Sequence, residues 1–117
     1  MANTFNNQVT SAINTSSTEI YTGTNLDASG DVGIVIGLIV SNDHATDDTQ
    51  VTIMHKASTA DGGAETEVAK LVKIPVNTSI EFCRGNKFVL KNGEKLTALR
   101  SSSGTANAMV SILEITS

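Results

Sequence analysis

The sequence predicts an all-β protein: a single antiparallel β-sandwich of about eight strands, with jelly-roll or immunoglobulin-like connections. Three observations predict this class. Short runs of Val, Ile, Leu and Thr alternate with loops of Ser, Asn, Gly and Asp, the connections are short, and no internal repeat is present. Because 117 residues suffice for one core, we expect one sandwich domain over residues 8–117 and an N-terminal arm over residues 1–7.

The first half of the chain is expected to begin with strands at residues 8–13 and 18–22, separated by a turn rich in Asn, Ser and Thr. Residues 32–40 are apolar on both faces and rich in β-branched side chains, a pattern that predicts a buried central strand. Gly33 and Gly37 interrupt this run, so we expect bulges or a close backbone approach there.

The middle of the chain predicts two further strands joined by a tip at residues 60–64. Residues 51–57 alternate between two faces, which is the pattern of a half-buried strand. Residues 66–74 end at Pro75, the only proline, and are interpreted as the second strand. A short amphipathic helix over residues 65–73 remains an alternative, because Val68, Leu71 and Val72 recur at helical spacing.

The last third predicts a meander of four strands. The sequence places them at residues 79–83, 87–90, 95–99 and 108–116. The pair Asn92-Gly93 favours a tight turn with left-handed backbone between the second and third of them.

Composition excludes several functions and favours self-association. The formal net charge is −4 and the basic residues are scattered singly, so we expect no nucleic-acid binding. No apolar run is long enough to span a bilayer, and the first residues carry no secretory signal pattern, so no membrane association is expected. The aromatic side chains are Phe5, Tyr21, Phe82 and Phe88 only. A core with so few aromatics would gain further burial through contacts between copies.

The polar clusters do not predict chemistry. The loop at residues 42–48 offers oxygen atoms and one imidazole, but it lacks the glycine and terminal glutamate of a calcium loop. It is interpreted as a solvated connection, with a surface calcium site as the alternative. His55 lies on an apolar strand face, and no Cys or acidic residue at a fixed spacing accompanies it, so it is a poor candidate for a general base or a metal ligand. Glu65 and Glu67 share one face and are expected to form a solvated edge, not an acid-base pair.

Cys83 is the only cysteine, so no intrachain disulfide can form, and synthesis in a reducing cytoplasm is expected. Arg84 beside it would lower the pKa of the thiol, although a buried structural thiol is the favoured interpretation. The sequence therefore predicts no enzyme, no catalytic residues, no cofactor and no metal site.

Several segments together resemble small virion structural proteins of tailed bacteriophages, especially those infecting cyanobacteria and other marine bacteria. The resemblance covers nearly the whole chain and rests on four segments: Met1-Ala2-Asn3-Thr4-Phe5, Glu19-Ile20-Tyr21-Thr22, Val35-Ile36-Gly37-Leu38-Ile39-Val40-Ser41-Asn42 and Val110-Ser111-Ile112-Leu113-Glu114-Ile115-Thr116. It implies a non-enzymatic virion protein, made in the host bacterial cytoplasm. In this role it would be a capsid decoration or cement protein that binds the major capsid protein, or an accessory part of neck, tail or fibre.

The N-terminal arm is the predicted assembly interface. Its residues Asn3, Thr4, Phe5, Asn6 and Asn7 are polar apart from one aromatic anchor, which suits strand addition to a neighbouring subunit. A homo-oligomer, preferably a trimer, is expected, because many weak contacts then bind a lattice strongly. A glycan-binding adhesion module is the alternative, weakened because only Tyr21 and Phe5 are candidates for an exposed aromatic platform.

Overall fold

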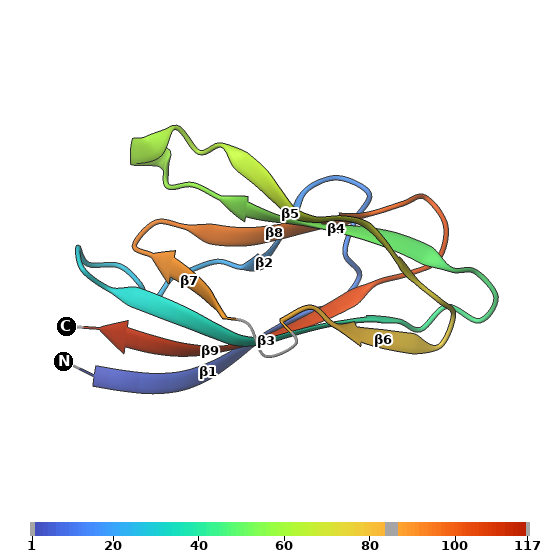
Figure 1. Ribbon diagram of the computed structural model, residues 1–117, viewed down its shortest axis with the longest axis horizontal. Helices are drawn as coiled ribbons and strands as arrows, with labels where there is room; N and C mark the ends of the chain where they lie inside the picture. The colour runs from blue at the N-terminus through green and yellow to red at the C-terminus, as the bar shows by residue number, and fades with distance from the viewer. Residues whose placement is uncertain (1, 84–86, 117) are drawn as a thin grey trace.

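The computed structural model describes residues 2–83 and 87–116, and it consists of two antiparallel sheets stacked face to face (Figure 1). Sheet A has the strand order β1-β9-β3-β6, with β7 also pairing β3, and sheet B has the order β2-β8-β4-β5. The all-β sandwich predicted from the sequence is confirmed. The elements are β1 (Ala2–Thr10), β2 (Thr18–Tyr21), β3 (Val32–Asn42), β4 (Thr49–Lys56), the 3-10 turn η1 (Thr59–Asp61), β5 (Glu65–Ile74), β6 (Thr78–Glu81), β7 (Phe88–Lys91), β8 (Lys95–Arg100) and β9 (Asn107–Thr116).

The connections are those of a jelly roll. Successive strands cross between the sheets, except for the β4–β5 hairpin and for β6 and β7. These two short strands follow one another along β3, β6 opposite residues 39–42 and β7 opposite residues 32–35. Taken as one interrupted strand they complete an eight-stranded double-sheet jelly roll, which decides between the two connection schemes expected from the sequence.

The meander predicted for the last third is wrong, although its strands exist. β7 lies in sheet A, β8 in sheet B and β9 again in sheet A. The chain turns the corner between sheets at Asn92-Gly93, where Gly93 has φ 84° and the Asn92 side-chain amide donates to the Leu26 carbonyl. A short glycine turn can join two strands of the same sheet or two strands of different sheets. The Asn-Gly pair therefore does not distinguish a hairpin from a connection that crosses between the sheets.

The expected arm is not separate from the sheet within the single chain. Residues 2–7 form the first part of β1, which pairs with β9 from Ala2 opposite Thr116 to Thr10 opposite Ala108 without a register shift. Figure 1 shows the start of β1 and the end of β9 side by side at one end of sheet A. The first strand therefore begins before the predicted residue 8 and ends before residue 13.

The core between the sheets is built from branched aliphatics, as the composition predicts. Gly33 lies where a Cβ atom would meet Ile112 Cδ1 at 2.7 Å, and a bulge separates Val35 from Gly37, so both expected features of this strand are present. Tyr21 is the one aromatic residue of the described chain that is fully buried. The largest fully buried side chains are Ile13, Ile20, Leu26, Leu38, Ile53, Ile74, Leu90, Leu96 and Ile112.

The segment that allowed a helical alternative is strand β5, paired with β4 through two register shifts. Gly62 and Gly63 at the hairpin tip have φ of 97° and 66°, as expected for a tip that needs left-handed backbone. Along the described residues, no helix has the length and apolar character needed to cross a membrane.

Candidate assembly surface

The side chains that most often carry chemistry are dispersed in the structure. His55 is half-buried on β4, with Nε2 3.3 Å from Glu94 Oε1. His44 lies in the loop at residues 42–48, where Nδ1 accepts backbone N–H groups of Thr46 and Asp47 at 3.2 and 3.0 Å. Within residues 2–83 and 87–116, no three His, Cys, Asp or Glu side chains gather in a way that would hold a metal ion.

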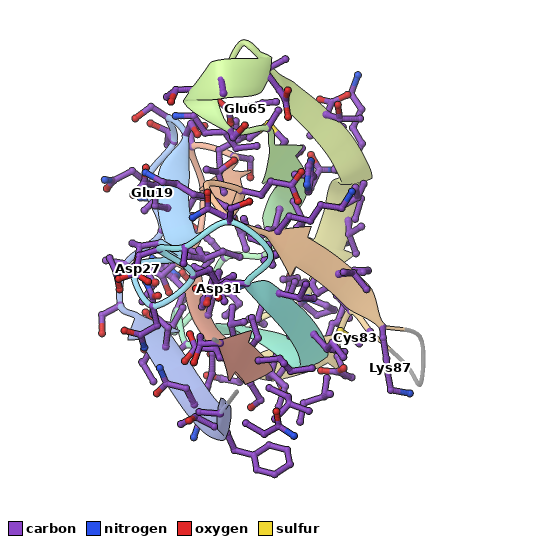
Figure 2. The ribbon with its side chains drawn as sticks, turned by 90° about the vertical axis from the view of Figure 1, so that its left-hand side faces the viewer. Glu19, Asp27, Asp31, Glu65, Cys83 and Lys87 are labelled. Atoms are coloured by element: carbon purple, nitrogen blue, oxygen red, sulfur yellow. The ribbon has the colours of Figure 1, made fainter. Side chains whose placement is uncertain are left out.

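Cys83 is a buried thiol, 1% exposed. Burial raises its pKa to about 11, and the charge of Glu81 and a hydrogen bond with that residue add to the effect. The position of Arg84, which the sequence placed beside this thiol, lies outside the described residues. Figure 2 shows Cys83 well away from Glu19 and Glu65. A thiol with a raised pKa is mostly protonated near neutral pH, which disfavours the nucleophile interpretation.

Glu65 and Glu67 do not form an acid-base pair. Glu65 Oε2 accepts hydroxyl groups of Thr97 at 2.7 Å and Ser17 at 2.8 Å, and these hydrogen bonds lower its pKa. Glu67 lies 3.7 Å from Lys70 in a surface ion pair. A general acid needs a raised pKa, so the environment of Glu65 is the opposite of the one required.

The polar loop at residues 42–48 closes one end of the sandwich. The buried Asn42 donates through Nδ2 to the carbonyls of Asp47 and Ile74, at 2.9 and 3.1 Å. Its Oδ1 accepts the N–H of Thr105 at 3.3 Å, which ties the loop to the neighbouring connection. Asp48 Oδ1 accepts the Val76 N–H at 2.9 Å. These oxygens are used within the chain, which agrees with a structural connection.

Tyr21, one of two aromatics considered for a sugar platform, is not exposed. Its hydroxyl donates to Glu114 Oε2 at 2.6 Å across the sandwich, and Glu114 is only 2% exposed. Asn25 Nδ2 and Asn6 Nδ2 donate to Glu114 Oε1 at 3.1 and 3.4 Å. Four hollows on the described surface are lined by polar and aliphatic residues, and none of the four contains an aromatic side chain. Of the two aromatic side chains considered for a glycan-binding platform, only Phe5 is exposed.

The outer face of sheet A, which points away from the core, is the most unusual surface of the chain. Strand register places Phe5 opposite Leu113, Leu113 opposite Ile34, and Ile34 opposite Val89, so one apolar row crosses the sheet. A second row joins Val9, Met109 and Ile39. Phe5, Val9 and Val89 are 75%, 66% and 55% exposed. Contiguous exposed apolar side chains of this kind mark interaction sites in soluble proteins.

Strand β1 contributes to this face because its polarity is inverted. The side chains directed to the sandwich interior are polar, namely Thr4, Asn6, Gln8 and Thr10, which stand opposite the buried Glu114, Ile112, Val110 and Ala108. Two of the outward side chains are the apolar Phe5 and Val9. A strand held only for its core contacts would show the reverse pattern, since one face of a strand is normally apolar and directed inward.

All five residues of the predicted interface lie in β1 and are exposed in the single chain. Sequence reasoning missed the rest of the surface, which comes from β3, β7 and β9. Residues 32–40 were interpreted as buried on both faces, and β3 is indeed central in sheet A, yet Ile36 and Ile39 are exposed. The apolar outward positions of the last strand, Met109 and Leu113, were the available signal for a second apolar face.

Comparisons with known proteins support the fold. No protein-family model matches the chain, and no curated protein matches it. A solved structure described as "Bacillus endospore appendages form a novel family of disulfide-linked pili" is similar, with a TM-score of 0.56 and 16% sequence identity over 97% of this chain and 88% of that chain. The resemblance to phage virion proteins gains no support from these comparisons and stays a prediction.

Proposed function

We propose that this chain is a non-enzymatic structural subunit that contacts other subunits through the outer face of sheet A. The two apolar rows of that face carry the proposal, because they expose side chains that a free monomer would normally keep from water. The interior is closed by fully buried aliphatics, and the carboxylates of Asp48, Glu65 and Glu114 accept hydrogen bonds from neighbouring strands and loops. These features suit a protein that works by holding a position in an assembly.

The likeness to a pilus subunit supports self-assembly into an extracellular structure, since that structure is described as an appendage built of linked subunits. The linkage would differ here. The chain has one cysteine, Cys83, and its thiol is buried. Contacts between copies of this chain would therefore be non-covalent, driven by apolar burial and strand pairing.

Capsid decoration is the more specific form of this proposal, and it comes from the resemblance to phage proteins. In that role the apolar face would rest on the major capsid protein of a virion. An accessory place in neck, tail or fibre uses the same surface with fewer copies. Quantifying the protein against the major shell protein in purified particles distinguishes these roles, because lattice decoration requires hundreds of copies and a neck or tail part a dozen or fewer.

The assembly surface itself is tested with Val89→Lys, which places a charge in the first apolar row. Val68→Lys is the matched control, because Val68 on β5 of sheet B is 50% exposed, close to the exposure of Val89. We expect wild type and Val68→Lys to form the same assemblies by light scattering, and Val89→Lys to lose the contacts made through the outer face of sheet A. The mass also tests the predicted trimer. A wild type that stays monomeric up to millimolar concentration would exclude self-assembly through this face.

A further inference from the structure

Strand β1 forms an edge of sheet A that lacks the usual protection against pairing. It runs from Ala2 to Thr10 beside β9 without a register shift, and its other edge pairs with no strand of residues 2–83 and 87–116. Its nine residues include no proline and no charged side chain. Natural edge strands are normally protected by charge, proline, bulges or shortness, because exposed backbone groups are a template for another strand.

The other sheet edges of the described chain do carry such protection. β5 contains Glu65, Glu67, Lys70 and Lys73, pairs through two register shifts and precedes Pro75. The edge strands β2, β6 and β7 have four residues each. β1 is therefore the long, regular and uncharged edge among those that the structure describes.

The backbone direction of β1 can be assigned from one hydrogen bond. The Asn7 N–H donates to Asn6 Oδ1 at 2.9 Å, so it is directed away from the ladder with β9. Because alternate residues of a strand present their backbone groups to the same side, Phe5 and Val9 also present theirs to the free edge. The Asn6 side chain that caps this group is exposed, and replacing its bond by another costs little.

We propose that two copies of this chain pair edge to edge through antiparallel β1 strands, with the two-fold axis at Asn7. This register sets Phe5 of each copy opposite Val9 of the other. Centring the axis on Phe5 forms one aromatic pair and gives Val9 no partner among the described residues of β1. Centring it on Asn6 sets Phe5 opposite an asparagine. The Asn7 register forms two apolar cross-strand pairs and keeps every outward side chain on its own face.

The pairing would also join the apolar faces of the two copies. The row that ends at Phe5 begins at Val89 and passes through Ile34 and Leu113. Across the contact it would continue into Val9, Met109 and Ile39 of the second copy. The inference thus deepens the proposed assembly role and rests on it: the subunit offered to a lattice is a dimer with one continuous apolar face. The two-fold contact replaces the trimer expected from the sequence.

A charge exchange at the axis tests the proposal. Asn7→Lys and Asn7→Asp each place like charges directly opposite each other, so either variant alone should dimerise about fivefold more weakly than wild type. An equimolar mixture of the two variants should recover the dimer, because opposite charges then face each other. Ser102→Lys and Ser102→Asp, in an exposed loop, are the matched controls and should behave as wild type. Sedimentation analysis over a concentration series measures wild type, the four single variants and the mixture.

Cysteine substitution tests the register. Opposing residues of a hydrogen-bonded antiparallel pair lie about 5.5 Å apart between Cα atoms, within the range that a disulfide spans. Asn7→Cys should therefore give covalent dimers under mild oxidation. Asn3→Cys should not, because its two copies would lie roughly 27 Å apart along the paired strands. Equal cross-linking of the two variants would overturn the register.

The outcomes separate this inference from the proposed function. Unchanged dimers in both Asn7 variants, combined with dissociation by Val89→Lys, would overturn the edge contact and leave assembly through the outer face standing. A monomeric wild type would overturn this inference and self-assembly through the outer face, and would leave only binding of that face to a different protein. Weakened single variants whose mixture recovers the dimer would establish a two-fold contact at Asn7.

Discussion

Replacing Tyr21 with phenylalanine removes one oxygen atom from the interior of the sandwich. The Tyr21 hydroxyl, on β2 of sheet B, donates to Glu114 on β9 of sheet A at 2.6 Å, and both residues are buried. A hydrogen bond to a charged acceptor contributes about 1.5–3 kcal/mol, and the buried carboxylate would keep only the weaker amide donors Asn25 and Asn6. The expected loss is therefore about 1.5–3 kcal/mol of unfolding free energy.

The measurement is denaturant unfolding, supported by a drop of roughly 5–12 °C in thermal midpoint for a chain of this size. The variant Glu114→Leu and the double variant complete the cycle. The double variant leaves neither a hydroxyl nor a carboxylate unpaired in the interior, and the exposed Asn25 and Asn6 amides can bond to water instead. It should therefore lose less than the sum of the two single losses. A Tyr21→Phe protein with wild-type stability, or single losses that simply add, would refute the idea that this bond joins the sheets.

Three further predictions follow from buried or constrained groups. Burial and the bond to Glu114 raise the pKa of Tyr21, the only tyrosine, so its absorbance should not titrate near pH 10 in the folded protein. The stability that the neutral hydroxyl contributes should be complete below that pH and fall as the pH rises above it. Titration of the folded protein near pH 10 would contradict a buried, hydrogen-bonded Tyr21. The rise in the pKa of Cys83 from 9.0 to about 11 corresponds to about 100-fold less thiolate, so alkylation at pH 8 should be fast only after unfolding. Equal alkylation rates in the folded and the unfolded protein would show an accessible thiol. Gly104→Ala should lose more stability than Gly30→Ala. Both glycines have positive φ, so either alanine costs about 1–2 kcal/mol in backbone strain, but only at Gly104 would the new Cβ atom meet another atom, the Asp48 carbonyl oxygen at 2.8 Å, since no atom lies within 4 Å at Gly30. Equal losses would rule out an effect of that contact.

Local patterns predicted most strand positions because they depend on few residues. Alternation along residues 51–57 and the apolar run at residues 32–40 identified β4 and β3 to within two residues at each end. The start of β1 was misplaced because its interior-facing side chains are polar, and a polar segment of this kind is typical of a surface arm. Its partners are Glu114 and other β9 residues about a hundred positions away, and no local pattern contains that contact.

The candidate surface was predicted only in part for the same reason. Phe5 was recognised as an anchor because an isolated aromatic in a polar segment is visible in the sequence. Val89, Met109 and Ile39 became part of the same surface only when register placed β7, β9 and β3 side by side with β1. The sequence shows that a strand has two faces, whereas sheet membership decides which face meets the core.

By itself the sequence determined that this is one small β-sandwich with scattered reactive side chains and an aliphatic interior, since these properties depend on composition and on period-two alternation. Only the tertiary structure decided that the sandwich is a jelly roll, that Tyr21 and Glu114 meet inside it, and that one sheet exposes apolar rows ending at an unprotected edge. Those features arise from pairing between strands distant in the chain, where backbone hydrogen bonds and register, not local propensity, determine the neighbours of each side chain.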